Sequence, residues 1–598
     1  MFRKAIIAAS IAAVLSGCGA EDRAYDTVER SAKEVTVQSL DTESLWMYMP
    51  STGEAPRYAL TQRGFFQGDP KSVKLRFDET NGIYVEALDR DKVDSLAPSR
   101  WDSEINRVPV LKIPGEFRQY RCAENGYGEC TNKEEVNHDE NVDWTTATHF
   151  IPDYENIESL SEDTLSTWYT ASNVSESAAP RVISYEYNPE EGVINVELER
   201  TFTADPEDQY EFGGLENLSF KTRFFYSLVK LDKLASSNYE PVYYQGQDSA
   251  YYGFFNDSKA VKTHTGESDV QGSRFAYINR FNPNLESIDY YLSDSYFDEG
   301  NEVYRQLTID TMKEVNESLE GTGVPPIKIV NTDKKAGIQS GDLRYNVFNL
   351  IDEPVDNGLL GYGPSATNPL TGEIIHAHVN QYLGVIRTTT RRYWNDLAMR
   401  YNRQEIAKFV PKENSAADSA ETEGDTASVV AERTDVDVFN DMISTDRGPE
   451  QFVPQLTESE MEFVGQGKFI NELPKADLSH KFDVTNQDAA LKAFYKRQDM
   501  LKRFSEQNVY SEDAMWLSTN AKGLIAGIDY AGGDYFADAE QNTMKKWNEL
   551  SLEQQKLASE AISEHMFKST LIHELGHNLG LRHNFMGSVD KTNFYTTE

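Results

Sequence analysis

The sequence predicts an α+β multidomain protein in which a β-rich region comes first and an α/β region follows. Up to about residue 280, short apolar runs alternate with polar residues at a period of two, and turn residues separate the runs. Beyond that point, apolar runs alternate with segments in which apolar residues recur every three or four positions. A chain of 598 residues is long enough for two or three domains. We therefore expect an N-terminal β-rich domain at 36–280 and an α/β domain at 281–598.

The amino terminus has the features of an export signal. Two basic residues precede an apolar run at 5–15, which is too short to span a bilayer as a helix. The four residues that end at Cys18 resemble a bacterial lipobox, which implies a lipoprotein signal peptide at 1–17 and lipidation of Cys18. The alternative is a cysteine that follows a small residue by chance. By this resemblance we expect a polar tether at 18–35 and a lipid-anchored protein of the bacterial cell envelope, and Gly19 favours the outer membrane, on its periplasmic or surface side.

The β-rich domain is predicted from hairpin patterns. Alternating residues flank Asn81-Gly82 within 73–87, and a second pair of alternating runs flanks the turn NPEEG within 182–202. Aromatic residues are dense here, which is typical of a sandwich or barrel core. We find no catalytic constellation in this region, so function is sought further along the chain.

Two cysteines remain after Cys18, and they lie close together in the sequence. An exported protein is expected to pair such residues, so we predict a disulfide between Cys122 and Cys130. The intervening AENGYGE is turn-forming, which places the disulfide at a hairpin tip. A zinc site made by this pair is not expected, because no further ligands lie nearby in the sequence.

The composition is strongly acidic, with a formal net charge of −40. A nucleic-acid duplex would be repelled, and no basic stripe compensates, so the charge excludes nucleic acid as a partner. An acidic surface also helps to keep an exported protein soluble.

The α/β region is predicted element by element. We expect, in order, a strand at 285–292, a helix at 303–319, strands at 327–330, 343–351 and 373–379, and a helix at 381–410. A low-complexity acidic stretch follows and predicts a disordered loop at 411–436, after which 437–550 is interpreted as an insertion. Ser551 and Gln554 form a capping-box pattern that predicts the start of the last helix.

The last helix contains the motif that indicates chemistry, HELGHNLGLRH. His573 and His577 stand four residues apart, so a helix places both on one face, where both rings can bind one metal ion. Glu574 lies between them and can take a proton from a metal-bound water as the catalytic base. Gly580 lets the helix end, so that His583 can return as a third ligand. Three imidazoles with one open position describe a catalytic Zn²⁺ site, and the alternative is a helix with merely solvated histidines.

The pattern H-E-x-x-H-x-x-G-x-x-H is that of the metzincin clan of zinc endopeptidases, which the chain resembles at all five defining positions. With NFMGS after it, the chain looks most like the large bacterial zinc-dependent metalloproteases whose third histidine precedes Asn-Phe. The resemblance implies a metzincin-like zinc-protease domain at 281–598, with strand, helix, strand, strand, edge strand and zinc helix in that order. Metzincins also carry a methionine turn further on. Because Met586 follows His583 too closely and the sequence ends fifteen residues after His583, we expect a C-terminal truncation.

These features together predict a zinc metalloendopeptidase that acts on a peptide or protein substrate. The strand at 373–379 is interpreted as an edge strand that could bind an extended peptide. His376 and His378 share one side of it; we expect them to face solvent, with a second metal site as the alternative. Two other functions stay open: a zinc hydrolase of a non-peptide amide, and a surface-binding lipoprotein with a vestigial zinc site. Retention of Glu574, which metal binding does not need, argues against the last.

Overall fold

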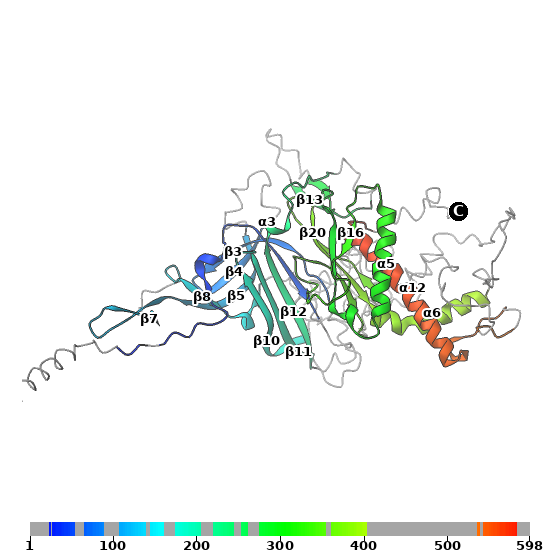
Figure 1. The fold of residues 1–598 in the computed structure, drawn as a ribbon, viewed down its shortest axis with the longest axis horizontal. Coiled ribbons are helices and arrows are strands. Elements are labelled where there is room, and N and C mark those ends of the chain that lie inside the picture. Colours follow the sequence, from blue (N-terminus) through cyan, green and yellow to red (C-terminus); the bar gives the residue numbers. More distant parts are fainter. Residues whose placement is uncertain are drawn as a thin grey trace, which may run out of the picture.

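The computed structural model describes part of the chain, and two large β-sheets that lie side by side organise this part (Figure 1). The described residues are 23–25, 27–53, 65–88, 107–138, 144–160, 174–204, 219–243, 253–260, 274–353, 360–403, 535–538 and 542–582. The signal peptide, Cys18, the acidic loop, most of the insertion and His583 lie outside these residues. Within the described part, the predicted α+β class is confirmed.

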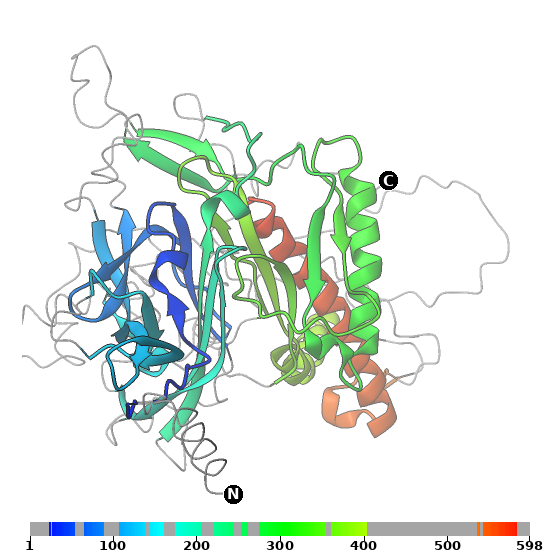
Figure 2. The ribbon, with the colours of Figure 1, turned by 60° about the vertical axis from the view of Figure 1, so that its left-hand side comes forward.

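The first large sheet is antiparallel and comes from the N-terminal part of the chain. Its strand order is β1-β8-β5-β4-β3-β2-β12-β11-β10, with β9 paired to β5, and it curls around its own core (Figure 2). The strands are β1 (Val35–Thr36), β2 (Trp46–Thr52), β3 (Lys71–Asp78), β4 (Gly82–Leu88), β5 (Arg107–Arg118), β8 (His149–Pro152), β9 (Glu158–Ser159), β10 (Val174–Asn188), β11 (Val193–Ala204) and β12 (Ser219–Lys230). A short helix, α3 (Leu231–Leu234), follows β12.

Both hairpins predicted from the sequence are present in this sheet. β3 and β4 pair around Asn81, whose φ of 56° is the left-handed conformation that asparagine tolerates in a tight turn. β10 and β11 pair from Asn188↔Val193 outward, and Gly192 before β11 has a φ of 68°. A side chain at Gly192 would also meet Lys230, so glycine is required there by both backbone and packing.

A separate hairpin projects from the first sheet. It consists of β6 (Tyr120–Glu124) and β7 (Cys130–Val136), and it extends away from the body of the molecule (Figure 1). Cys122 and Cys130 are joined by a disulfide across it, with their Cα atoms 5.3 Å apart. The turn between the two cysteines is held by Asn125, whose side chain accepts hydrogen bonds from the N–H groups of Tyr127 and Glu129.

The second large sheet is mostly parallel, with the order β16-β15-β17-β20-β18 and with β19 also paired to β20. Parallel pairs join β15, β16, β17 and β20, whereas β18 and β19 run antiparallel to β20. The strands are β15 (Ile288–Leu292), β16 (Ile327–Ile329), β17 (Asn346–Ile351), β18 (Gly361–Tyr362), β19 (Ser365–Thr367) and β20 (Ile374–Tyr382). The helices packed with it are α5 (Glu302–Leu319), α6 (Leu383–Asn402) and α12 (Leu552–Asn578).

The predicted edge strand at 373–379 is wrong in its position. The chain there forms β20, which lies between β17 on one side and β18 and β19 on the other. Within the described residues, β18 and β19 form the edge on this side of the sheet, and β16 forms the opposite edge. Their sequence, GYGPSAT, contains two glycines and a proline, and it therefore lacks the period-two apolar pattern by which a strand is detected.

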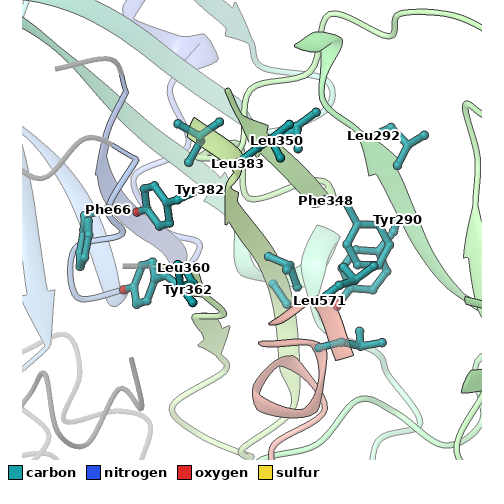
Figure 3. Packing of buried hydrophobic residues seen from close by; sticks show 14 of the residues in the cluster. Phe66, Tyr290, Leu292, Phe348, Leu350, Leu360, Tyr362, Tyr382, Leu383 and Leu571 are labelled. Atoms are coloured by element: carbon teal, nitrogen blue, oxygen red, sulfur yellow. The ribbon is translucent and has the colours of Figure 1, made fainter. Parts of the chain in front are cut away.

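One apolar core runs through both parts of the molecule (Figure 3). Tyr290 on β15 stacks on Phe348 on β17, with ring centroids 4.4 Å apart, and Leu571 of α12 belongs to the same cluster. Phe66, from the chain between β2 and β3, stacks on Tyr362 of β18 at 4.5 Å. Because the core is continuous, the edge strand is held against the N-terminal sheet by buried aromatic contacts.

The two sheets are also joined by a second apolar cluster and an ion-pair network. Met47 and Met49 on β2 are fully buried and cluster with Leu343 from the loop before β17. Full burial of such a side chain contributes about 1.5–3 kcal/mol. Beside them, the Arg344 guanidinium donates to both oxygens of Glu186 on β10, at 3.0 and 2.7 Å. The contact between the two sheets thus combines buried apolar residues with a charge-assisted pair of hydrogen bonds.

The helices pack against the second sheet through buried side chains. α12 buries residues on both flanks, including Ile562, Met566 and Phe567. No helix among the described residues has both the length and the apolar composition that crossing a membrane requires.

Candidate metal site

α12 carries the predicted motif and begins as the sequence predicts. Ser551 is its N-cap: the Ser551 hydroxyl accepts a hydrogen bond from the Gln554 N–H at 3.2 Å, and the Gln554 side chain accepts one from the Ser551 N–H at 2.8 Å. This reciprocal pair of hydrogen bonds satisfies backbone N–H groups at the start of the helix, which have no carbonyl acceptor within the helix. The predicted capping box is confirmed.

The helix ends at the predicted glycine. Gly580 has a φ of 94°, and the Gly580 N–H donates to the His577 carbonyl while the Leu581 N–H donates to the Gly576 carbonyl. A Cβ at Gly580 would collide with the carbonyl oxygen of Asn279. Glycine is therefore needed both for the turn and for the close approach of a neighbouring segment.

The rings of His573 and His577 converge on one point. Their Nε2 atoms are 3.0 Å apart, His577 is buried and His573 is partly exposed. Two imidazoles that bind one zinc ion at 2.0–2.1 Å in tetrahedral geometry have nitrogens about 3.3 Å apart, so the spacing fits a shared metal ion. Nδ1 of His577 lies 2.7 Å from the Leu581 carbonyl. A carbonyl can only accept, so Nδ1 carries the proton and the Nε2 lone pair faces the shared point.

Glu574 is fully buried and packs against the edge strand. A Cβ at Gly361 would lie 2.6 Å from Cγ and 2.8 Å from Oε1 of Glu574. A Cβ at Gly363 would collide with the Glu574 backbone, at 2.9 Å from its carbonyl carbon and 3.0 Å from its Cα. The absence of side chains at Gly361 and Gly363 therefore allows α12 and β18 to approach closely enough to enclose this carboxyl group. Sequence reasoning missed both glycines, although the pattern GYG marks a possible close approach of two backbones.

Substitution of Gly363 should show how much this approach matters. Gly363→Ala is expected to destabilise the protein by about 1–3 kcal/mol, because the new methyl group meets rigid backbone rather than a movable side chain. The measurement is the midpoint of thermal unfolding. Gly576→Ala is the matched control, because a Cβ there meets only Leu581 at 3.9 Å and alanine favours the helix. Equal midpoints for Gly363→Ala and the wild type would refute the close-approach argument.

Asn578 holds the end of α12 against the sheet, and sequence reasoning missed it as well. Its side-chain amide donates to the carbonyls of Pro364 and His378, each at 3.0 Å, and its oxygen accepts from the Tyr290 hydroxyl at 3.0 Å. The partners come from three different parts of the sheet. Since Asn578 is buried and adjacent to His577, these bonds restrict rotation of the helix end and so fix the direction of the His577 ring.

The third predicted ligand, His583, lies outside the described residues, as does Met586. Within the described residues, no group of three or more His, Cys, Asp or Glu side chains is arranged to hold a metal ion. The structure thus brings together the rings of His573 and His577, and it places Glu574 on the same helix against the edge strand; the completion of the ligand set by His583 stays a prediction.

The expectation that His376 and His378 face solvent is wrong. Both lie on the interior strand β20, and both side chains are buried. His376 Nε2 and His378 Nδ1 are 3.3 Å apart. Burial lowers the pKa of His376 to about 4 and lowers the pKa of His378 well below its usual range, with a smaller contribution from repulsion by His376.

Neutral buried histidines make stability depend on pH. In the unfolded chain a histidine takes up a proton near pH 6.5, whereas His376 in the folded protein does so only near pH 4. Stability that is present above pH 6.5 is therefore lost as pH falls from 6.5 towards 4. For His376 alone the loss between pH 8 and pH 5 is about 2 kcal/mol.

The test is the midpoint of thermal unfolding measured across pH 8 to 5, which we expect to fall more steeply for the wild type than for His376→Gln. The slope with pH is compared rather than the midpoint itself, because any substitution in the core shifts the midpoint. His138→Gln, at an exposed position, is the control and should keep the wild-type slope. The argument fails if His376→Gln and the wild type lose stability in parallel.

Comparison with known proteins gives no family for this chain. No protein-family model, no curated protein and no solved structure matches it. The functional argument therefore rests on the site itself.

Proposed function

We propose that the protein is a zinc-dependent metalloendopeptidase, with His573, His577 and His583 as metal ligands and Glu574 as general base. One observation carries the proposal. The Nε2 atoms of His573 and His577 lie 3.0 Å apart on one face of α12, and the Leu581 carbonyl holds His577 in the tautomer whose lone pair is on Nε2, the nitrogen that faces His573. Histidines that were only solvated would have no need of such an orienting bond.

The order of the first elements of the second sheet supports the same function. Along the chain these elements are β15, α5, β16, β17, the edge strands β18 and β19, the interior strand β20, α6 and α12. The metzincin resemblance implies strand, helix, strand, strand, edge strand and zinc helix in that order, so the chain shares the order up to the edge strands, and β20 and α6 come between these and α12. An extended peptide suits such a site, because its backbone can pair with a strand at a sheet edge.

Each residue has a distinct role in the proposed reaction. Zinc bound to the histidines would supply a Lewis acid for the scissile carbonyl and would lower the pKa of water. Glu574 accepts the proton of the attacking water and returns it to the leaving amine. Because Glu574 packs against Gly361, the carboxyl group is restricted to a narrow range of orientations.

Cleavage of a peptide library, followed by mass spectrometry, tests the proposal. We expect the full chain to cleave internal peptide bonds, a chelator to stop cleavage, and added zinc to restore it. A hydrolase of small non-peptide amides would instead act on short acyl amides with no gain from longer peptides. Zinc binding without cleavage of any peptide would contradict the proposed activity and favour a binding protein.

We also propose that the protein is anchored to an envelope membrane by lipid on Cys18, on the basis of the lipobox resemblance. Cys18→Ser should move the protein from the membrane fraction to the soluble fraction, because acyl chains supply the anchoring free energy. Cell fractionation and mass spectrometry of the mature amino terminus are the measurements. An unmodified amino terminus in the wild-type protein would rule the anchor out.

A further inference from the structure

A segment that precedes the second sheet in the sequence lies along the C-terminal end of α12. We call α12 the metal helix, because it carries His573 and His577. Residues 253–255 precede β13 (Asn256–Ala260), which forms a hairpin with β14 (Arg274–Ile278). Phe254 forms an antiparallel bridge with Leu581, more than three hundred residues later. The Phe255 N–H donates to the Gly580 carbonyl at 2.7 Å, and the Arg582 N–H donates to the Gly253 carbonyl at 2.8 Å. We call residues 253–255 the strap.

The strap acts on the part of the chain that orients His577. Its two hydrogen bonds flank Leu581, and the Leu581 carbonyl is the acceptor for His577 Nδ1. A displacement of residues 580–582 would therefore change the direction of the His577 ring. Backbone pairing on both sides of Leu581 prevents that displacement.

The strap also contacts His577 directly. The rings of Phe255 and His577 have centroids 6.0 Å apart and planes inclined by 67°, an edge-to-face arrangement. Such a contact stabilises one orientation of the imidazole and excludes water from its flank.

The C-terminal side of the strap is also held in place. The Asn279 N–H, directly after β14, donates to the Phe255 carbonyl at 2.9 Å. Two residues beyond the strap, the Asp257 carboxylate on β13 accepts a hydrogen bond of 2.6 Å from the Thr367 hydroxyl on the edge strand β19. The strap and the start of β13 thus connect the edge strand to the end of α12.

We propose that Phe255 is a positioning residue of the metal site, and that the strap holds His577 and the turn at 580–582 in the geometry that binds zinc. This inference rests on the proposed zinc site. By this inference, the region that precedes the second sheet in the sequence helps to position a metal ligand. This region is then more than a separate module attached to a protease. Orienting partners of metal ligands commonly contribute tenfold to a hundredfold in affinity.

Zinc affinity of the full chain, measured by competition with a chromogenic chelator, tests this proposal. Phe255→Ala is expected to weaken zinc binding by about tenfold to a hundredfold. Phe255→Tyr retains the ring and should bind within about threefold of the wild type. Phe297→Ala removes a partly buried ring of the same size that lies in neither the strap nor α12, and it is the matched control, with wild-type affinity expected. Cobalt substitution adds a second readout, because the visible spectrum reports ligand geometry.

The outcomes separate the two proposals. If the wild type binds zinc, and Phe255→Ala folds and binds it equally tightly with an unchanged cobalt spectrum, the role of the strap is wrong and the zinc site stands. If the wild type binds no zinc, both proposals fail. Should Phe255→Ala not fold, Phe255→Leu keeps most of the apolar volume without the aromatic ring. It is then expected to bind zinc at least about threefold more weakly than Phe297→Ala, and equal affinity would overturn the proposal.

Discussion

Glu574→Gln is expected to reduce peptide hydrolysis by about 10²–10⁴-fold, because the variant has no group that can accept the proton of the attacking water. Zinc content should stay near that of the wild type, since Glu574 is not assigned as a ligand. Glutamine is chosen because it matches the shape of glutamate, and the close contact with Gly361 tolerates little change in volume. Cleavage rate and zinc content are measured on the same preparation, so that loss of metal cannot imitate loss of the base.

Glu564→Gln is the matched control for this experiment. Glu564 lies ten positions earlier on the same helix and is only partly buried. Its removal should leave the cleavage rate within about twofold of the wild type, as surface substitutions away from a site usually do. Equal rates for Glu574→Gln and the wild type, at equal zinc occupancy, would show that another group performs the proton transfer.

The metal helix could be predicted from sequence because its signals are local. The capping box at Ser551, the four-residue spacing of His573 and His577, and the glycine at the end all act within a few turns. Such signals do not depend on which segments pack nearby. The α+β class could be predicted for a similar reason. Apolar residues recur every two positions in a strand and every three to four positions in a helix, and this pattern can be recognised within each element by itself.

The order of strands in the second sheet could not be predicted so readily. β20 has a strong strand pattern, but a pattern within one strand does not state how many neighbours it has. The true edge strand β18 is only two residues long, begins with Gly361 and is followed directly by Gly363 and Pro364, so its composition resembles a loop. The same uncertainty led to the wrong environment for His376 and His378, because histidines on an edge strand are solvated and those on an interior strand are buried.

Contacts between distant segments were not predictable at all. The strap and Leu581 are joined mainly by backbone hydrogen bonds, which leave no trace in side-chain chemistry. The glycines of the edge strand matter through the absence of a side chain, and Asn578 matters through three partners that come from different strands. Residues that orient a site are in general harder to read from one sequence than the residues that carry its chemistry.

His573→Ala and His577→Ala are each expected to weaken zinc binding by more than about a hundredfold, which exceeds the effect expected of an orienting partner. The reason is that each variant loses one of the two nitrogens that converge at 3.0 Å. His565→Ala, on the same helix and partly buried, is the control and should retain zinc.

Bound zinc is measured by elemental analysis after dialysis against a buffered low concentration of the free metal. The expected stoichiometry is near one per chain for the wild type and for His565→Ala, and near zero for the other two variants. Stoichiometric zinc in both His573→Ala and His577→Ala would move the site elsewhere. The pair His376 and His378 would then be tested next, because their ring nitrogens also lie 3.3 Å apart. Loss of zinc from a His376→Ala protein with His573 and His577 intact would identify that pair as the site and refute the assignment to α12.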